Sequence, residues 1–219
     1  MTLKFKKAIV IGGSKGLGKE ISLSLKKIKI KTIACSRKEI DTSNLLSVEK
    51  FAKNHKRTDI LILNTGGPPP LKFKEIKIED WKNYFNQLFL SFFILLKNIK
   101  INNGGYVFYI SSSIIKEPGD SLIISSSLRS AMSSMLKSFS LEKSSYGITT
   151  INIAPGPFKT NRVKQLVKNL NAYEKTLPTK KIGNPKEIGE FVKFIIKKKI
   201  KYISGSTVYF DGNLNKGYN

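Results

Sequence analysis

The chain has 219 residues, and its 40% hydrophobic content can bury one sizeable core, so we expect a single domain over residues 1–219. The formal charge of +24 would suit a nucleic-acid-binding protein. However, only four of the 39 basic residues are arginine, at positions 37, 57, 129 and 162, and the lysines are spread over every segment. A specific nucleic-acid site would gather arginines with stacking aromatic side chains, so we expect no such partner.

The sequence also argues against a membrane, secreted or metal-binding protein. It contains no twenty-residue apolar run and no signal-peptide pattern. Cys35 is the only cysteine, which excludes an intrachain disulfide and a thiolate metal cluster, and no carboxylate or histidine cluster suggests another metal site. We therefore expect a cytoplasmic protein without a metal.

The hydrophobic pattern predicts strands that alternate with helices along the chain. We expect helices at 16–29, 44–55, 79–100, 121–146 and 185–198, and strands at 6–11, 31–35, 59–63, 105–111, 148–153 and 206–210. This order predicts an α/β fold: a Rossmann-like, doubly wound parallel sheet with helices on both faces. Turn-rich segments at 66–70, 118–120 and 155–160 follow strands, which places them at the carboxyl edge where such sheets bind ligands.

The first predicted strand runs into a glycine-rich turn that opens the first helix, Gly12-Gly13-Ser14-Lys15-Gly16-Leu17-Gly18. Gly12 suits the tight turn, Gly16 allows a phosphate to approach, and Gly18 lets the helix pack on the strand. The free N–H groups of the helix start could then bind a nucleotide phosphate, with Ser14, Lys15 and Leu17 beside it. An ordinary tight turn between strand and helix is the alternative.

The second predicted strand ends in Ser36-Arg37, where a doubly wound fold meets the adenosine ribose. An acidic residue here would bind the ribose hydroxyls of NAD, whereas Arg37 offers a cation to a 2′-phosphate, and Lys15 could add a second one. We therefore favour NADP, with NAD possible. The alternative is that both basic side chains are simply solvated.

The third predicted strand ends in Asn64-Thr65-Gly66-Gly67. The Asn64 amide can hold the strand edges together, and the glycines let the backbone pass close to a ribose. A plain turn before the three prolines at 68–70 is the alternative.

These motifs, in this order, resemble the short-chain dehydrogenase/reductase family, of the type similar to 3-oxoacyl-(acyl-carrier-protein) reductases. The glycine turn matches the family's Thr-Gly-x-x-x-Gly-x-Gly with Ile11 in the threonine position, and 64–67 is a variant of its Asn-Asn-Ala-Gly. The segment Pro155-Gly156-Pro157-Phe158-Lys159-Thr160 matches its Pro-Gly-x-x-x-Thr loop, and 184–188 and 203–212 match its last helix and strand. The resemblance spans nearly the whole chain.

The resemblance implies cofactor contacts for several further residues. Pro155, Gly156, Phe158 and Thr160 would contact the nicotinamide end of the cofactor, and Asp41 stands where the family has the aspartate that caps the adenine. The chain is shortened after the second strand, where the family carries another helix, so one face of the sheet should be thinly covered.

The resemblance also implies a homodimer or homotetramer, formed through the helices predicted at 79–100 and 121–146. Phenylalanines recur there at spacings of three and four, at 85, 89, 92 and 93. Core packing would explain the same apolar stripe.

The catalytic residues depart from the family. Ser112 falls on the serine that polarises the substrate oxygen, but Ser125 replaces the tyrosine acid and Arg129 the lysine four residues later. Residues 125 and 129 still face one spot because they lie at i, i+4 on one helix. Leu88 replaces the asparagine that positions a relay water. A serine hydroxyl is a much weaker acid than a phenol, so Lys116, Tyr84 or Tyr173 could supply the acid instead. The favoured alternative for each is an ordinary solvated lysine or packed ring.

The sequence therefore leads to three hypotheses. The first is an NADP(H)-dependent oxidoreductase that interconverts a small-molecule carbonyl and an alcohol, with a non-standard site of Ser112, Ser125 and Arg129. The second is a cofactor-binding protein or subunit that has lost catalysis. The third is a lyase or epimerase acting on a nucleotide-linked sugar.

Overall fold

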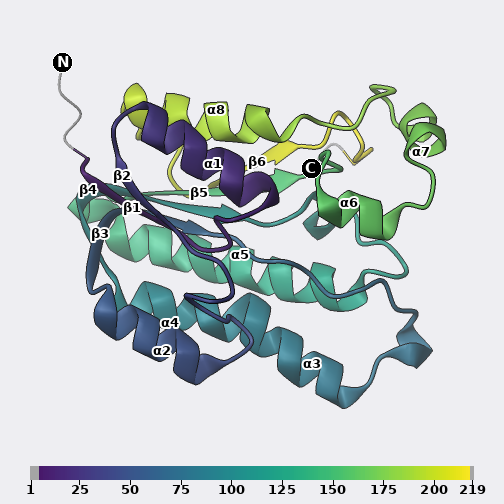
Figure 1. Cartoon of the computed structure of the whole chain (residues 1–219), viewed down its shortest axis with the longest axis horizontal. Helices are drawn as coiled ribbons and strands as arrows, with labels where there is room; N and C mark the ends of the chain where they lie inside the picture. Colours follow the sequence, from purple (N-terminus) through teal and green to yellow (C-terminus); the bar gives the residue numbers. More distant parts are fainter. Residues whose placement is uncertain (1–4, 218–219) are drawn as a thin grey trace.

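The computed structural model describes residues 5–217 and contains one six-stranded parallel sheet. Its strands run in the order β2-β1-β3-β4-β5-β6 (Figure 1). Their bounds are β1 Lys7–Val10, β2 Lys31–Ala34, β3 Arg57–Leu63, β4 Lys100–Ile110, β5 Thr149–Pro155 and β6 Ser206–Phe210. The chain moves outward from β1 to β2 and then returns to the other side with β3, so the winding direction switches beside β1. The predicted doubly wound α/β fold is confirmed.

Helices cover both faces of the sheet (Figure 1). One face carries α1 (Gly16–Lys27) and α8 (Pro185–Lys197), and the other carries α2 (Leu45–Asn54), α4 (Ser91–Asn98) and α5 (Ile123–Lys143). The chain is completed by α3 (Ile78–Phe85), α6 (Asn161–Leu166) and α7 (Leu170–Thr176). No helix among residues 5–217 is both long and apolar enough to cross a bilayer.

The two faces of the sheet divide the core because successive strand side chains point to opposite sides. In β1, Ile9 packs against α2, α4 and α5, while its neighbours Ala8 and Val10 pack against α1 and α8. The same alternation places Leu61 and Ile62 of β3 in opposite halves of the core. Strands apolar on both faces, as these are, characterise a buried parallel sheet.

The shortening after β2 leaves β2 at the edge of the sheet. Its exposure agrees with the expected thin cover, since Lys31 is exposed and the other three residues are only partly buried. In this region β2 passes into the 36–44 loop and then directly into α2, which Asn44 caps by accepting a hydrogen bond from the Ser47 N–H.

Several predicted boundaries were wrong. The helix expected at 79–100 is α3, a π-helical turn at Asn86–Leu90, and α4, and it ends at Asn98 because β4 begins at Lys100 instead of 105. Strand β3 begins at Arg57, two residues earlier than expected, and pairs there with Lys100. The segment after residue 160, for which no helix was predicted, contains α6 and α7.

The phenylalanine stripe divides between the core and the surface. Phe92 is fully buried, whereas Phe85 and Phe93 are exposed, with the Phe85 ring stacked on the partly buried Phe89 at 5.3 Å. Core packing therefore accounts for part of the stripe, and the homodimer or homotetramer stays a prediction.

Candidate active site

A cavity of about 460 Å³ opens at the carboxyl edge of the sheet, beside the switch in winding. Its walls come from segments that follow β1, β3, β4 and β5, together with α5 and α6. The predicted site residues that line it are Gly12, Ser14, Lys15, Gly16, Leu17, Asn64, Thr65, Gly66, Ser112, Ser125, Arg129, Pro155, Gly156, Phe158 and Thr160. The structure therefore brings most of the predicted site into one space. Gly18, Ser36, Arg37 and Asp41 lie outside it.

The glycine turn is built around the amide of Asn64. The Asn64 side chain donates a hydrogen bond to the Gly12 carbonyl at 3.1 Å, which ties the end of β3 to the turn after β1 as expected. Gly12 has a φ of +62°, a backbone conformation that favours glycine. A Cβ on Gly18 would overlap the Gly12 carbonyl oxygen and lie 2.8 Å from the Asn64 amide nitrogen, so only glycine lets α1 approach this closely.

The start of α1 faces the cavity without a side-chain cap. Lys15 occupies the N-cap position and makes no side-chain capping hydrogen bond, and no acidic residue lies in the first turn of the helix. The first N–H groups of a 12-residue helix are thus left for an anion, as a nucleotide phosphate requires.

The predicted adenosine side differs from expectation because a carboxylate, that of Glu39, lies beside Ser36. Glu39 accepts hydrogen bonds from both the backbone N–H and the hydroxyl of Ser36, each at 2.6 Å. These bonds lower the pKa of Glu39 and keep it charged at neutral pH. Glu39 was not among the predicted site residues, although an acid near the end of the second strand is the feature that favours NAD.

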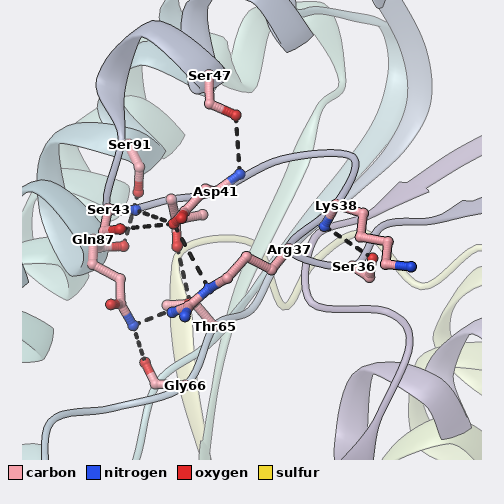
Figure 2. Close-up of polar contacts among 11 residues, drawn as sticks. Ser36, Arg37, Lys38, Asp41, Ser43, Ser47, Thr65, Gly66, Gln87 and Ser91 are labelled. Carbon is pink, nitrogen blue, oxygen red and sulfur yellow. Dashed lines mark hydrogen bonds and ion pairs between the residues drawn. The ribbon is translucent and has the colours of Figure 1, made fainter.

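Arg37 turns back toward Asp41 and forms an ion pair with it, Nε to Oδ1, at 3.8 Å (Figure 2). The Arg37 side chain is 77% exposed, so the ion pair leaves it accessible to a phosphate. Burial would raise the pKa of Asp41, but hydrogen bonds from Ser43 and the charge of Arg37 lower it. Asp41 is thus already engaged within its loop, and nothing in this geometry directs its carboxylate to an adenine.

The π-helical turn directs a glutamine toward the end of β3, and the sequence analysis did not identify it. Leu88, at the family's asparagine position, is fully buried against Ile124 and Leu128 and offers no polar group. Its neighbour Gln87 instead donates from its side-chain amide to the Gly66 carbonyl at 2.9 Å (Figure 2). π-helical turns occur often at functional sites. This signal for Gln87 is visible only in the structure, because the sequence does not reveal the π-helical turn.

Ser125 and Arg129 meet as their spacing predicts. The Arg129 Nε donates to the Ser125 hydroxyl oxygen at 3.2 Å, and both side chains are buried. Ser112 also lines the cavity, and its hydroxyl makes no capping hydrogen bond to the short turn that follows it.

Arg129 additionally holds together the ends of two strands. Its Nη1 donates to the Ile110 carbonyl at 3.1 Å and to the Ser111 carbonyl at 3.3 Å, and its Nη2 donates to the Thr65 carbonyl at 3.4 Å. Arginine can serve these separate acceptors because its donors are spread over a planar fork, which a lysine lacks.

The three residues considered as substitute acids lie in different surroundings. Tyr173 lines the cavity, and burial raises its phenol pKa above the usual value, so it is a weaker acid there. Tyr84 packs in the small apolar cluster around Leu88, and the Lys116 ammonium lies over the Tyr209 ring, 5.5 Å from its centroid.

Comparison with known proteins agrees with this architecture. A family model described as enoyl-(acyl carrier protein) reductase matches residues 25–215. The chain is 28% identical to 3-oxoacyl-[acyl-carrier-protein] reductase FabG of Buchnera aphidicola subsp. Schizaphis graminum, covering 98% of this chain and 99% of that protein. It is 25% identical to the NADPH-dependent reductase BacG of Bacillus subtilis, covering 95% and 97%.

Solved structures show the same fold. YwfH, an NADPH-dependent reductase involved in bacilysin biosynthesis, superposes with a TM-score of 0.86 at 23% identity, covering 98% of this chain and 100% of that one. A blue fluorescent protein from a metagenomic library, solved in complex with NADPH, gives a TM-score of 0.87 at 18% identity, covering 98% and 99%. Since the family model spans most of the chain, this protein belongs to the short-chain dehydrogenase/reductase family.

Proposed function

We propose that this protein is an NADP(H)-dependent oxidoreductase that interconverts a small carbonyl compound and its alcohol. The observation that carries the proposal is a single cavity lined by the glycine turn, the ends of β3, β4 and β5, and the cluster of Ser112, Ser125 and Arg129. A ligand cavity at the switch in winding is where a doubly wound sheet binds a dinucleotide.

The chain's own residues fit such a cofactor. The uncapped start of α1 and Lys15 would hold the pyrophosphate, and the segment Pro155–Thr160 would line the nicotinamide end. The NADPH dependence of BacG and the NADPH complex of a structural neighbour support NADP. Arg37 supports it as well, whereas the charge of Glu39 opposes a 2′-phosphate, so NAD stays the alternative.

When bound, the cofactor would supply or accept a hydride at the substrate carbon. Ser112 would donate a hydrogen bond to the substrate oxygen, where negative charge develops during reduction. Because the Ser125 oxygen accepts from Arg129, its own proton is free to point to the same oxygen. Ser125 would thus stabilise the developing alkoxide, and the proton would come from solvent, because a serine hydroxyl is too weak an acid to give up its own.

A cofactor-binding protein without catalysis is the second candidate, and the contacts of Arg129 favour it. Three of its hydrogen bonds go to carbonyls at the ends of β3 and β4, as a purely structural side chain would make them.

Binding and turnover measurements distinguish the two candidates. NADPH should raise the melting temperature more than NADH, and Arg37→Asp should remove the difference; equal shifts from both cofactors would refute the NADP assignment. With a panel of carbonyl compounds, the wild-type protein should oxidise NADPH and Ser112→Ala should not. Cofactor binding without turnover of any compound would favour the second candidate.

A further inference from the structure

Two arginines from distant parts of the chain meet at Gly67 on the cavity wall. A Cβ built on Gly67 would lie 3.5 Å from Nη2 of Arg129, 3.5 Å from Nη2 of Arg162 and 3.6 Å from the Ser125 oxygen. The two Nη2 atoms are therefore within about 7 Å of each other. Arg129 comes from α5 and Arg162 from α6, so three donors from separate turns converge on the bare face of one glycine.

Among residues 5–217, no carboxylate pairs with this cluster. The cavity is lined by Lys15, Arg129 and Arg162 but by no aspartate or glutamate. Within residues 5–217, no ion pair involves either arginine. Arg129 donates only to carbonyls and a hydroxyl, and Arg162 donates to the Pro68 carbonyl.

Two neighbouring cations without a carboxylate between them repel each other. Burial lowers the pKa of Arg162 and the charge of Arg129 lowers it further, while the nearby Tyr84 phenol acts in the opposite direction. An anion placed between the guanidinium groups would replace this repulsion with two charge-assisted hydrogen bonds.

Gly67 itself is not required by the backbone. Its φ lies outside the left-handed region, and an added methyl group would make only ordinary van der Waals contacts. This contrasts with Gly12 and Gly18, where a side chain would collide with the backbone. The absent side chain at 67 leaves room for about one methyl-sized group against the two arginines, and this position lies on the cavity wall where a ligand could occupy it.

We propose that Arg129 and Arg162 bind a carboxylate or phosphate of the substrate, so that the substrate class is a small carbonyl or hydroxy compound carrying an anionic group. Arg162 donates to one carbonyl, so its planar fork keeps further N–H groups for either anion, whereas Arg129 would add the second N–H of its Nη2. The proposal rests on the proposed function for its reacting end at Ser112. Ser125, which the proposed function directs to the substrate oxygen, stands beside the arginines, so we expect the anionic group to be only a few bonds from the carbonyl carbon.

The test compares anionic ligands with neutral analogues of similar size. Isothermal titration would use acetoacetate against pentane-2,4-dione, pyruvate against butane-2,3-dione, and dihydroxyacetone phosphate against dihydroxyacetone, with and without the oxidised cofactor NADP+, which cannot reduce these carbonyl compounds. The variants are Arg162→Gln, Gly67→Ala and Arg162→Lys. Arg57→Gln is the matched control, because it removes the same charge from an exposed position at the start of β3.

At least one anion should bind the wild-type protein about tenfold more tightly than its neutral partner, and Arg162→Gln should weaken it about 10- to 100-fold. Gly67→Ala should weaken it too, Arg162→Lys should retain part of the affinity, and Arg57→Gln should leave it unchanged. Circular dichroism melting would verify that each variant is folded. No preference for any anion, or equal losses in Arg162→Gln and Arg57→Gln, would overturn the proposal.

Cofactor titrations on the same variants identify the source of the anion. Unchanged affinity of Arg162→Gln for NADPH and NADH assigns the arginine pair to the substrate, whereas a loss matching that of the anionic ligands would assign it to a cofactor phosphate and overturn the proposal. The proposed function fails separately, if the protein selects anions but does not oxidise NADPH with any of the carbonyl compounds.

Discussion

Substituting Gly18 by alanine tests whether the turn after β1 is built as a cofactor cradle. The added methyl group would overlap the Gly12 carbonyl oxygen and lie 2.9 Å from its carbon and 2.8 Å from the Asn64 amide nitrogen. Normal carbon contacts are about 3.5 Å or longer, so α1 must move away from the turn by about 1 Å or the Asn64 hydrogen bond must break.

The cost follows from these contacts. Overpacking of this kind costs about 1–3 kcal/mol, and the lost hydrogen bond adds about 1 kcal/mol. Alanine returns up to about 1 kcal/mol through its higher helix propensity. We therefore expect the free energy of unfolding to fall by about 2–3 kcal/mol, which lowers the melting temperature of a domain of this size by roughly 5–10 °C.

Thermal unfolding followed by circular dichroism, with and without NADPH, measures both consequences. The variant should melt earlier, and it should lose most of the stabilisation that NADPH gives the wild-type protein. Gly119→Ala is the control, since Gly119 is exposed and its added Cβ would meet no heavy atom within 4 Å. An unchanged melting temperature in Gly18→Ala, together with a full NADPH shift, would refute this account of the turn.

Three further predictions concern charges in and near the site. Glu39→Gln should raise the affinity for NADPH relative to NADH, because a negative charge that repels a 2′-phosphate near Ser36 is removed. Parallel fluorescence titrations would measure the ratio of the two affinities, and an unchanged ratio would contradict this prediction. Arg129→Met should destabilise the protein by about 3 kcal/mol in urea unfolding, since three carbonyls lose a charged donor; a variant as stable as the wild type would show that the contacts do not matter. For Asp59, burial would raise the carboxyl pKa, but hydrogen bonds from the Asn102 side chain and two backbone N–H groups lower it overall. The carboxylate therefore stabilises the fold above its unfolded pKa of about 3.9, and that stability is lost as the pH falls through the lower folded pKa. The difference in free energy of unfolding between the wild type and Asp59→Asn should shrink in that pH range. A constant difference would exclude a contribution from the titration of Asp59.

Local sequence rules predicted the frame of the site well. The role of Asn64 in joining two strand ends follows from its place after a buried strand, and its hydrogen bond to Gly12 confirms it. The meeting of Ser125 and Arg129 follows from the helical repeat alone. Each of these features follows from the residue pattern of a single element, so the sequence alone predicts it.

Features that depend on tertiary pairing could not be predicted. The strand predicted at 105–111 starts at Lys100 instead, because residues 100 and 101 pair with the start of β3 and a register shift accommodates the residues between. The acceptors of Arg129 lie 18 to 64 residues away along the chain, and no local pattern indicates them. The meeting of Arg162 with Arg129 at Gly67 likewise appears only once α6 is in place.

NADPH that carries deuterium on the transferring position of the nicotinamide would show whether a hydride is transferred at this cavity. The wild-type protein should yield an alcohol with one deuterium on the former carbonyl carbon, detected by mass spectrometry. Ser112→Ala should bind NADPH with unchanged affinity but transfer little or no deuterium. Tight NADPH binding with no deuterium in any product of the carbonyl panel would contradict hydride transfer at this cavity.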